Sequence, residues 1–308
     1  MSDINVAIPR GKSSLRLLTA GTYCPSDIVI DAGDAGVDVA VITGNGLSTL
    51  ASLPSTVTKI RPYCFYQAGY LGFTELPAAV TEIGNYAFYQ TNLSELVSLP
   101  ASLTTIGQNA FQYSNYLKLT SLPGSVTQIE NNAFNGCDDL ALTSLPAGLT
   151  TINQGVFQQC SALALTSLPS GITSIGSSAF NSCSALALTS LPSGLTSIAD
   201  NAFRYCTSLA LTSLPSGLTT IGSYAFDGCT SLAITNIPAG VTTIPYNAFN
   251  NCTGLNTITF KGTPSTINAY AFNKCTNIKT INVPWAEGAV ANAPWGATGA
   301  TINYNYKG

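Results

Sequence analysis

Residues 211–233 read Leu-Thr-Ser-Leu-Pro-Ser-Gly-Leu-Thr-Thr-Ile-Gly-Ser-Tyr-Ala-Phe-Asp-Gly-Cys-Thr-Ser-Leu-Ala, and this unit recurs along the chain with a period of 23 residues. Phenylalanine occupies the same place in ten consecutive units, from Phe65 to Phe272. Isoleucine recurs five residues earlier in each unit, from Ile60 to Ile267. Proline and cysteine form two further columns with the same period. A fixed period of this length is the signature of a repeat architecture.

The parts of the unit predict its local structure. Residues 211–214 form a short extended segment that ends at Pro215, because proline cannot donate to a strand ladder. Residues 218–221 are rich in β-branched side chains and predict a second extended run, which Gly222 breaks. Residues 224–229 are then long enough for about one helical turn. One unit cannot bury its phenylalanine and leucines, whereas stacked units can, so we predict a repeat solenoid of about ten coils, each with short β-strands and one helical turn.

The spacing of the apolar residues that follow cysteine changes near the end of the repeat region. Residues 209–214 have the pattern Leu-x-Leu-x-x-Leu, whereas residues 255–260 have the pattern Leu-x-x-Ile-x-Phe. Side chains alternate between the two faces of a strand, so a shift by one place predicts a β-bulge or a local bend in the last coils.

The repeated motif resembles the BspA-like, or Treponema-type, leucine-rich repeats. The motif Ile-Gly-x-x-Ala-Phe-x-x-Cys-x-x-Leu stands at residues 175–186, and the resemblance covers roughly residues 47–284. The first three units depart from it, because Ala68, Thr91 and Ser114 stand where the family has cysteine. The resemblance implies an all-repeat solenoid used for binding, often as a bacterial surface adhesin, and it implies no enzyme activity.

The two flanks resemble a different class of protein. Residues 17–30 look like the short β modules of bacteriophage and prophage tail proteins. Residues 283–304 resemble the terminal segment of repeat proteins encoded in prophages of gut bacteria. Both resemblances are shorter than the one carried by the repeats.

Three regions are therefore expected: an N-terminal β cap and attachment module at 1–46, the leucine-rich repeat solenoid at 47–283, and a C-terminal cap at 284–308. A solenoid needs capped ends because its terminal coils would otherwise expose their core. The chain has only two tryptophans, Trp285 and Trp295, and both lie in the last region. We expect them to plug the final coil.

The composition excludes several classes of function. The chain has no histidine, which removes histidine-based triads and histidine metal sites, and no other base than a carboxylate or lysine remains to activate serine or threonine. Its net charge is −3, and only 8% of its residues are charged, which disfavours nucleic acid as a partner. No run of about 18 apolar residues predicts a membrane span. The start of the chain lacks an apolar signal-peptide core, so a secretory signal is not expected.

The cysteines predict a structural ladder. Seven of them recur with the repeat period, which favours buried thiols that pack as small apolar groups. A disulfide framework fits poorly, since nine is an odd number and parallel neighbours rarely reach the required dihedral angle. No paired Cys-x-x-Cys exists for a metal site. Cys24 and Cys64 lie outside the ladder and are expected to be more reactive.

The acidic stretch at 31–38 lacks the ligand spacing of a calcium-binding loop, so we predict that it forms a solvated loop.

Tyrosines supply the candidate binding site. Several tyrosines occupy the same repeat position in different units. Because Phe, Ile and Leu already fill the core, we expect these tyrosines to lie at the surface, stacked on adjacent coils. A tyrosine offers a rigid apolar face with a polar tip, which suits contact with sugars and proteins. The alternative is packing against the N-terminal cap or a sister subunit. The candidate residues are Tyr63, Tyr66, Tyr70, Tyr86, Tyr89, Tyr113 and Tyr116.

The remaining surface is predicted to be neutral and rich in hydroxyl and amide groups, with Arg204 as the only basic residue between positions 127 and 260. Such a surface suits glycan or weak multivalent recognition.

We therefore expect a non-enzymatic, cofactor-free and metal-free phage or prophage tail protein that recognises a glycan or protein on a bacterial surface. Its N-terminal module would join other tail or virion proteins, as a monomer or a homo-oligomer, in a virion or extracellular location. The alternatives are a bacterial adhesin for host matrix or other microbes, and a structural spacer in a virion.

Overall fold

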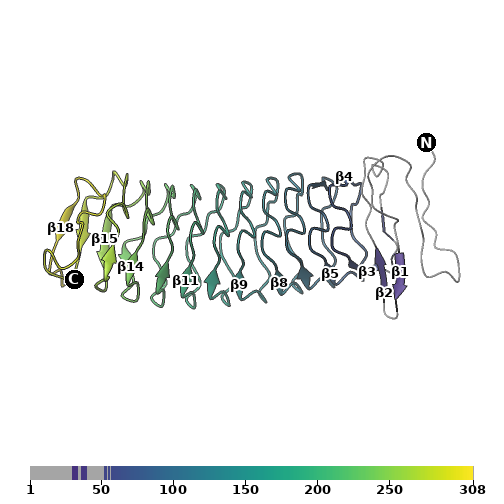
Figure 1. Cartoon of the computed structure of the whole chain (residues 1–308), viewed down its shortest axis with the longest axis horizontal. Coiled ribbons are helices and arrows are strands. Elements are labelled where there is room, and N and C mark those ends of the chain that lie inside the picture. Colours follow the sequence, from purple (N-terminus) through teal and green to yellow (C-terminus); the bar gives the residue numbers. More distant parts are fainter. Residues whose placement is uncertain (1–29, 34–35, 40–51, 54, 56, 308) are drawn as a thin grey trace. The chain divides into compact units, whose positions relative to one another are not determined.

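The computed structural model describes residues 30–33, 36–39, 52–53, 55 and 57–307. Most of the expected N-terminal module, including Cys24, lies outside the described residues. The chain forms two compact units, residues 1–148 and 149–308, and the described repeats of each are coils stacked side by side (Figure 1).

In the first unit, each coil adds a short strand to one six-stranded sheet. Its strands, in spatial order, are β1 (Ile30–Gly33), β2 (Gly36–Val39), β3 (Val57–Ile60), β5 (Glu82–Ile83), β7 (Thr105–Ile106) and β8 (Gln128–Ile129). A further parallel pair consists of β4 (Gly69–Tyr70) and β6 (Thr91–Asn92). Strands β1 and β2 pair antiparallel, so the acidic stretch 31–38 lies largely in strands rather than in the predicted loop. All later neighbours pair parallel.

The second unit has three parallel sheets. The first contains β9 (Thr151–Ile152), β10 (Ser174–Ile175), β11 (Ser197–Ile198) and β12 (Thr220–Ile221). The second contains β14 (Thr243–Ile244) and β16 (Thr266–Ile267). The third contains β13 (Asn236–Ile237), β15 (Thr257–Phe260), β17 (Thr280–Asn282) and β18 (Thr301–Asn303). The stacked 23-residue coils confirm the predicted repeat solenoid.

The two-residue strands follow from alternation between the core and solvent. In each coil the isoleucine points inward, as Ile198 does, while the polar residue before it is exposed or half-buried. Exposed threonines two residues before the isoleucine also link the coils, because the Thr219 hydroxyl donates to the Thr196 carbonyl oxygen, 23 residues earlier, at 3.1 Å. The Thr196 hydroxyl repeats this contact with the Thr173 carbonyl oxygen at 3.3 Å.

The predicted helical turn is wrong: the described residues contain no helix. The backbone around Phe65 shows why. The Phe65 N–H donates to the Ala87 carbonyl oxygen of the next coil at 2.7 Å, whereas the Tyr66 N–H turns back to the Tyr63 carbonyl oxygen at 3.2 Å. A helix needs every N–H to bond within the segment, four residues back. Tyr63 and Gln67 have φ of 61° and 53°, as the third residue of a tight turn requires, so the segment is a series of turns bonded to the next coil.

Phenylalanine rings form the centre of each unit's core. In the first unit, successive rings from Phe65 to Phe134 stack with centroids 5.1 to 5.3 Å apart. In the second, the rings from Phe157 to Phe272 stack at 5.2 to 5.7 Å. All of these rings are fully buried. One phenylalanine in every 23-residue repeat therefore places each ring against the ring of the next coil.

The cysteine column is buried, as predicted, but it also donates hydrogen bonds. The thiols of Cys137, Cys183, Cys206, Cys229, Cys252 and Cys275 each donate to the carbonyl oxygen of the phenylalanine one coil earlier, at 2.8 to 3.0 Å. The hydroxyls of Thr91 and Ser114 make the same bond, to Phe65 at 2.7 Å and to Phe88 at 2.6 Å. The departures from the family motif at these two positions therefore keep the same hydrogen-bond donor.

The prediction that Cys64 is a reactive thiol is wrong. Its side chain is fully buried, and burial raises its pKa far above the ordinary value, although nearby Arg61 lowers it somewhat. The thiolate is the reactive form, so a buried thiol with a raised pKa is inert. Cys24 lies outside the described residues, so its predicted reactivity stays a prediction.

The last coils also differ from the expected bulge. Strand β15 alternates between half-buried and buried residues without interruption, with Ile258 and Phe260 inward. Its register with β17 is continuous from Thr257 to Thr259. The shifted apolar spacing therefore creates a regular four-residue strand, because Ile258 and Phe260 now stand two residues apart on one face.

Both tryptophans are buried beside the last coils. Trp285 packs edge-on against Phe260 with ring centroids 5.3 Å apart, and Trp295 lies 6.3 Å from Trp285. The Trp295 indole N–H donates to the Ala291 carbonyl oxygen at 2.7 Å. This packing agrees with the expected plug, while the boundary at residue 284 stays a prediction. Nothing in the described part of the chain forms a helix that could span a lipid bilayer.

Candidate binding surfaces

The turns around each phenylalanine form one face of every coil, which we call the turn face: the residues from three before the phenylalanine to two after it. Five of the seven candidate tyrosines lie on this face in the first unit. We define them as the first tyrosine surface: Tyr63, Tyr66, Tyr86, Tyr89 and Tyr113.

Four of these rings form two short ladders. Tyr63 stacks on Tyr86 with centroids 4.9 Å apart and planes 5° apart, and Tyr66 stacks on Tyr89 at 4.8 Å and 7°. The two ladders also touch, because Tyr63 lies 5.7 Å from Tyr66 and Tyr86 lies 5.8 Å from Tyr89. The predicted stacking on adjacent coils is therefore confirmed for both columns.

Tyr113 extends this surface by one coil. Its ring meets Tyr89 edge-on at 5.8 Å. It lies over Gly136, where an added Cβ would fall only 2.5 Å from the Tyr113 Cδ1, so the glycine leaves room for the ring. Burial among the rings and the neighbouring phenols of Tyr66, Tyr113 and Tyr86 raises the pKa of Tyr89. The Tyr89 phenol thus remains a neutral hydrogen-bonding group at physiological pH.

The structure does not bring the other two candidates into this surface. Tyr70 lies in β4 and pairs with Asn92 of β6. Tyr116 is exposed beyond the turns. Neither makes a ring contact with the first tyrosine surface within the described residues.

A polar pocket of about 310 Å³ lies beside the first tyrosine surface. Its side chains include Glu82, Asn85, Thr105, Gln108 and Glu130, and its wall includes Pro62. Pro62 and Asn85 directly precede Tyr63 and Tyr86 in the chain. The pocket therefore adds carboxylate, amide and hydroxyl groups next to the aromatic rings.

Neighbouring residues hold the walls of this pocket in place. The Lys59 ammonium contacts the Glu82 carboxylate at 2.8 Å, across two adjacent coils. The Asn85 side-chain oxygen accepts from the Gln108 N–H at 2.8 Å. At Gly84 an added Cβ would lie 2.5 Å from the Pro62 nitrogen, so only glycine permits this close approach of the coils.

A second group of tyrosines, which the sequence pattern did not reveal, lies on the turn face of the second unit. We define it as the second tyrosine surface: Arg204, Tyr205, Tyr224, Tyr246 and Tyr270. Tyr224 and Tyr246 meet edge to face at 5.4 Å, and Tyr246 and Tyr270 meet at 5.7 Å, both at 69°. Its tyrosines stand at three different repeat positions, so no single column revealed them.

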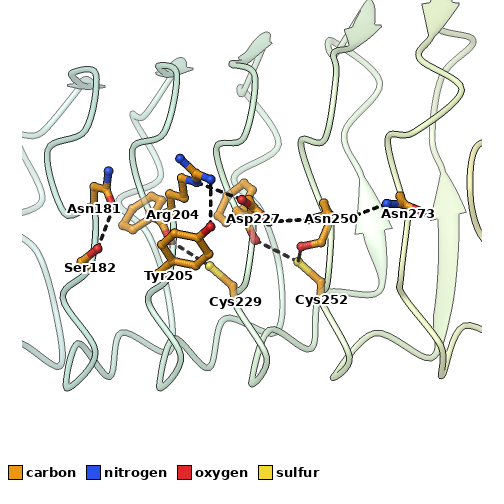
Figure 2. Close-up of polar contacts among 11 residues, drawn as sticks. Asn181, Ser182, Arg204, Tyr205, Asp227, Cys229, Asn250, Cys252 and Asn273 are labelled. Atoms are coloured by element: carbon orange, nitrogen blue, oxygen red, sulfur yellow. Dashed lines mark hydrogen bonds and ion pairs between the residues drawn. The ribbon is translucent and has the colours of Figure 1, made fainter.

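A polar ladder runs from Tyr205 and Arg204 through Asp227 and Asn250 to Asn273 (Figure 2). The Arg204 Nε donates to the Asp227 carboxylate at 2.9 Å, and the Arg204 Nη2 donates to the Tyr205 hydroxyl at 2.8 Å. The Asn250 amide donates to the other Asp227 oxygen at 2.6 Å, and the Asn273 amide donates to the Asn250 oxygen at 3.0 Å. Partial burial lowers the pKa of Arg204, but the bonds to Asp227 and Tyr205 outweigh it, so the pKa is raised and the side chain stays charged.

Comparison with known proteins places the repeats in a family. The profile described as BspA type Leucine rich repeat region matches the chain in six copies, over residues 46–164, 81–210 and 173–287. No curated protein sequence matches the chain.

Among solved structures, the chain is similar to a leucine rich cell surface protein from Faecalibacterium prausnitzii A2-165, with 23% identity, a TM-score of 0.52, and coverage of 94% of this chain and 96% of that one. It is also similar to a leucine-rich repeat protein of T. pallidum, with 27% identity, a TM-score of 0.45, and coverage of 72% and 89%. A third likeness is to the pneumococcal vaccine antigen PcpA, with 14% identity, a TM-score of 0.42, and coverage of 89% and 95%. The first of these likenesses agrees with the solenoid fold.

Proposed function

The chain belongs to the BspA-type leucine-rich repeat family, and on that basis we propose that it is a non-enzymatic protein that recognises a bacterial surface through its first tyrosine surface. The ligand is a glycan or a protein of the bacterial envelope. The observation that carries the proposal is the pair of stacked tyrosine ladders on the turn face, beside a polar pocket. Tyr63 is exposed, and Tyr66, Tyr86 and Tyr89 are half-buried.

The chemistry of this surface supports a binding role. The rings are rigid because each is held against its neighbour, so little side-chain entropy is lost when a ligand binds. Their hydroxyl tips repeat from coil to coil, and the pocket supplies amide and carboxylate partners next to them. A ligand with many hydroxyl groups meets both kinds of contact.

The finer proposal is that the protein is associated with the tail of a phage or prophage. It rests on the resemblance of residues 17–30 and 283–304 to segments of tail and prophage-encoded repeat proteins. In this setting residues 1–46 attach to other tail proteins, and the coils present the binding surface in many copies, where copy number supplies strength.

A second candidate function is a bacterial adhesin that binds host matrix or other microbes. The Faecalibacterium protein, which shares the fold, is described as a cell surface protein, and this favours the alternative. The two functions differ in their target, since the first requires bacterial envelopes and the second includes host matrix proteins.

The test is binding of fluorescently labelled full-length protein to intact bacteria from a panel of gut strains, with purified mammalian matrix proteins alongside. We expect strain-selective binding to bacteria that the Tyr66→Ala/Tyr89→Ala variant loses. Tyr306→Ala removes an exposed tyrosine elsewhere and is the matched control. An unchanged urea midpoint for each variant shows that the fold is retained.

Binding to matrix alone would favour the adhesin. Binding to neither target would contradict recognition and favour a structural spacer. Bacterial binding that survives loss of both tyrosines would contradict the assigned surface.

A further inference from the structure

The second tyrosine surface presents its rings differently from the first. In the first surface, parallel stacking at 4.8 to 4.9 Å covers one face of each stacked ring. In the second, Tyr246 meets both Tyr224 and Tyr270 edge to face. Tyr246 is 43% exposed and Tyr270 is 54% exposed. Open aromatic surface is therefore available on successive coils of the second unit.

Arg204 gives this surface a positive charge, which is paired with the Asp227 carboxylate. It is the only basic residue between positions 127 and 260. Its guanidinium carbon lies 4.6 Å from the centre of the Tyr205 ring and 5.0 Å from that of Tyr224. Among the described residues its Nη1 has no hydrogen-bond partner, and Figure 2 shows one guanidinium nitrogen directed away from both Asp227 and Tyr205. The outer edge of the guanidinium is thus open to a ligand.

The surrounding residues fix the guanidinium before any ligand arrives. Asp227 is nearly fully buried, and it holds Arg204 on one side and Asn250 on the other. Tyr205 lies over Gly228, where an added Cβ would come within 2.5 Å of its Cδ1. A charged group held in this way loses little entropy on binding.

We propose that the second tyrosine surface binds a carboxylated glycan chain, which is a site independent of the proposed function of the first surface. The ligand carboxylate accepts hydrogen bonds from the Nη1–Nη2 edge of Arg204, a geometry that guanidinium and carboxylate share. The apolar faces of the sugar rings pack on Tyr205, Tyr246 and Tyr270. Neighbouring coils lie about 4.7–4.9 Å apart, close to the length of one sugar in an extended polysaccharide, so successive sugars can meet successive coils.

The test uses the full chain on an array of bacterial and plant oligosaccharides that includes uronic-acid oligomers, their methyl esters, and neutral oligomers of the same linkage. We expect the carboxylated oligomers to bind, and the esters and neutral oligomers to bind about tenfold or more weakly, as loss of a hydrogen-bonded charge implies. The Arg204→Gln/Asp227→Asn variant should lose the same factor. It removes both charges but keeps amides that continue the polar ladder, so it avoids a buried, unpaired carboxylate.

Further variants separate binding from folding. Tyr246→Ala/Tyr270→Ala should weaken binding of the same oligomers while leaving the Arg204–Asp227 pair intact. Lys261→Gln removes another exposed positive charge of the second unit and should have no effect. The Tyr66→Ala/Tyr89→Ala variant should also bind the oligomers normally, so failure of the proposed function and failure of this site give different results.

Three outcomes would overturn the proposal. The first is an array on which no carboxylated oligomer binds. The second is equal binding of the acids and their methyl esters. The third is binding that the Arg204→Gln/Asp227→Asn variant retains while its urea midpoint matches that of the unmodified protein.

Discussion

The Cys206 thiol donates a hydrogen bond to the Phe180 carbonyl oxygen of the preceding coil at 2.9 Å. That oxygen also accepts the Cys183 N–H, at 3.1 Å. The same arrangement recurs at each described cysteine for which the bond is given above, and hydroxyls replace the thiol at Thr91 and Ser114. This repeat position is therefore occupied by a small side chain with a hydrogen-bond donor, and not merely by a small apolar side chain.

Removal of this donor should destabilise the fold modestly. Cys206→Ala should lower the free energy of unfolding by about 1–2 kcal/mol, because the Phe180 oxygen loses one of its two donors. Cys206→Ser keeps a donor and should cost less than about 1 kcal/mol. Urea unfolding measured by circular dichroism checks both values. Equal losses for alanine and serine would show that size alone governs the column.

Burial of the thiols predicts low reactivity and a loss of stability at high pH. Burial raises the pKa of Cys183, Cys206 and Cys252 well above the ordinary 9.0. In a Cys24→Ser variant the folded protein should react slowly with an aromatic disulfide reagent, and all remaining thiols should react in urea. The unfolded chain releases thiol protons above about pH 9 while the folded chain keeps them, so the urea midpoint should hold below that pH and fall above it. Rapid labelling of the folded variant would contradict the buried ladder.

A glycine that accommodates a ring gives a third prediction. Gly228 has φ of 76°, and an added Cβ would fall 2.5 Å from the Tyr205 Cδ1. Gly228→Ala should therefore cost about 1–3 kcal/mol and displace the Tyr205 ring, which a shift of its NMR ring signals would report. Gly217→Ala, in the same unit, is the matched control, since nothing lies within 4 Å of its added Cβ. Equal effects of the two variants would contradict the packing of Tyr205 on Gly228.

The stacked core predicts a large effect from one ring. Phe203 is fully buried, and its ring centroid lies 5.4 Å from that of Phe180 and 5.5 Å from that of Phe226. Phe203→Ala should lower the free energy of unfolding by about 3–5 kcal/mol. Hydrogen exchange should increase first in the neighbouring coils, because each repeat contacts mainly its neighbours. Tyr306→Ala, at an exposed ring, should leave the unfolding free energy nearly unchanged. A uniform increase in exchange across the second unit would contradict this local stacking.

The repeat period alone predicted the solenoid and its core. A residue that recurs every 23 positions must meet its own kind in the next coil, and the stacks of phenylalanine and of Tyr63 on Tyr86 follow from that. The turns were harder to predict. Their N–H groups bond to the next coil, a partner that is not visible within one unit, and Tyr63 and Gln67 adopt a positive φ that their residue types rarely favour.

The functional surfaces were predictable only where tyrosines share a column. Tyr66 and Tyr89 do, and their ladder was expected from spacing. Tyr205 and Tyr246 stand at different repeat positions, two residues after and three residues before the phenylalanine, so their common surface emerged only from the folded turns. Thr91 and Ser114 could have predicted the hydrogen bond of the cysteine column, because both replace cysteine with another hydrogen-bond donor.

Protection of tyrosines on bound cells tests the recognition proposal most directly. Full-length protein bound to a selected bacterial strain would be nitrated at exposed tyrosines and compared by mass spectrometry with protein in solution. We predict protection of Tyr63, Tyr66, Tyr86 and Tyr89, with Tyr306 modified equally in both samples. Equal modification of the four ladder tyrosines in bound and unbound protein would contradict recognition through the first tyrosine surface.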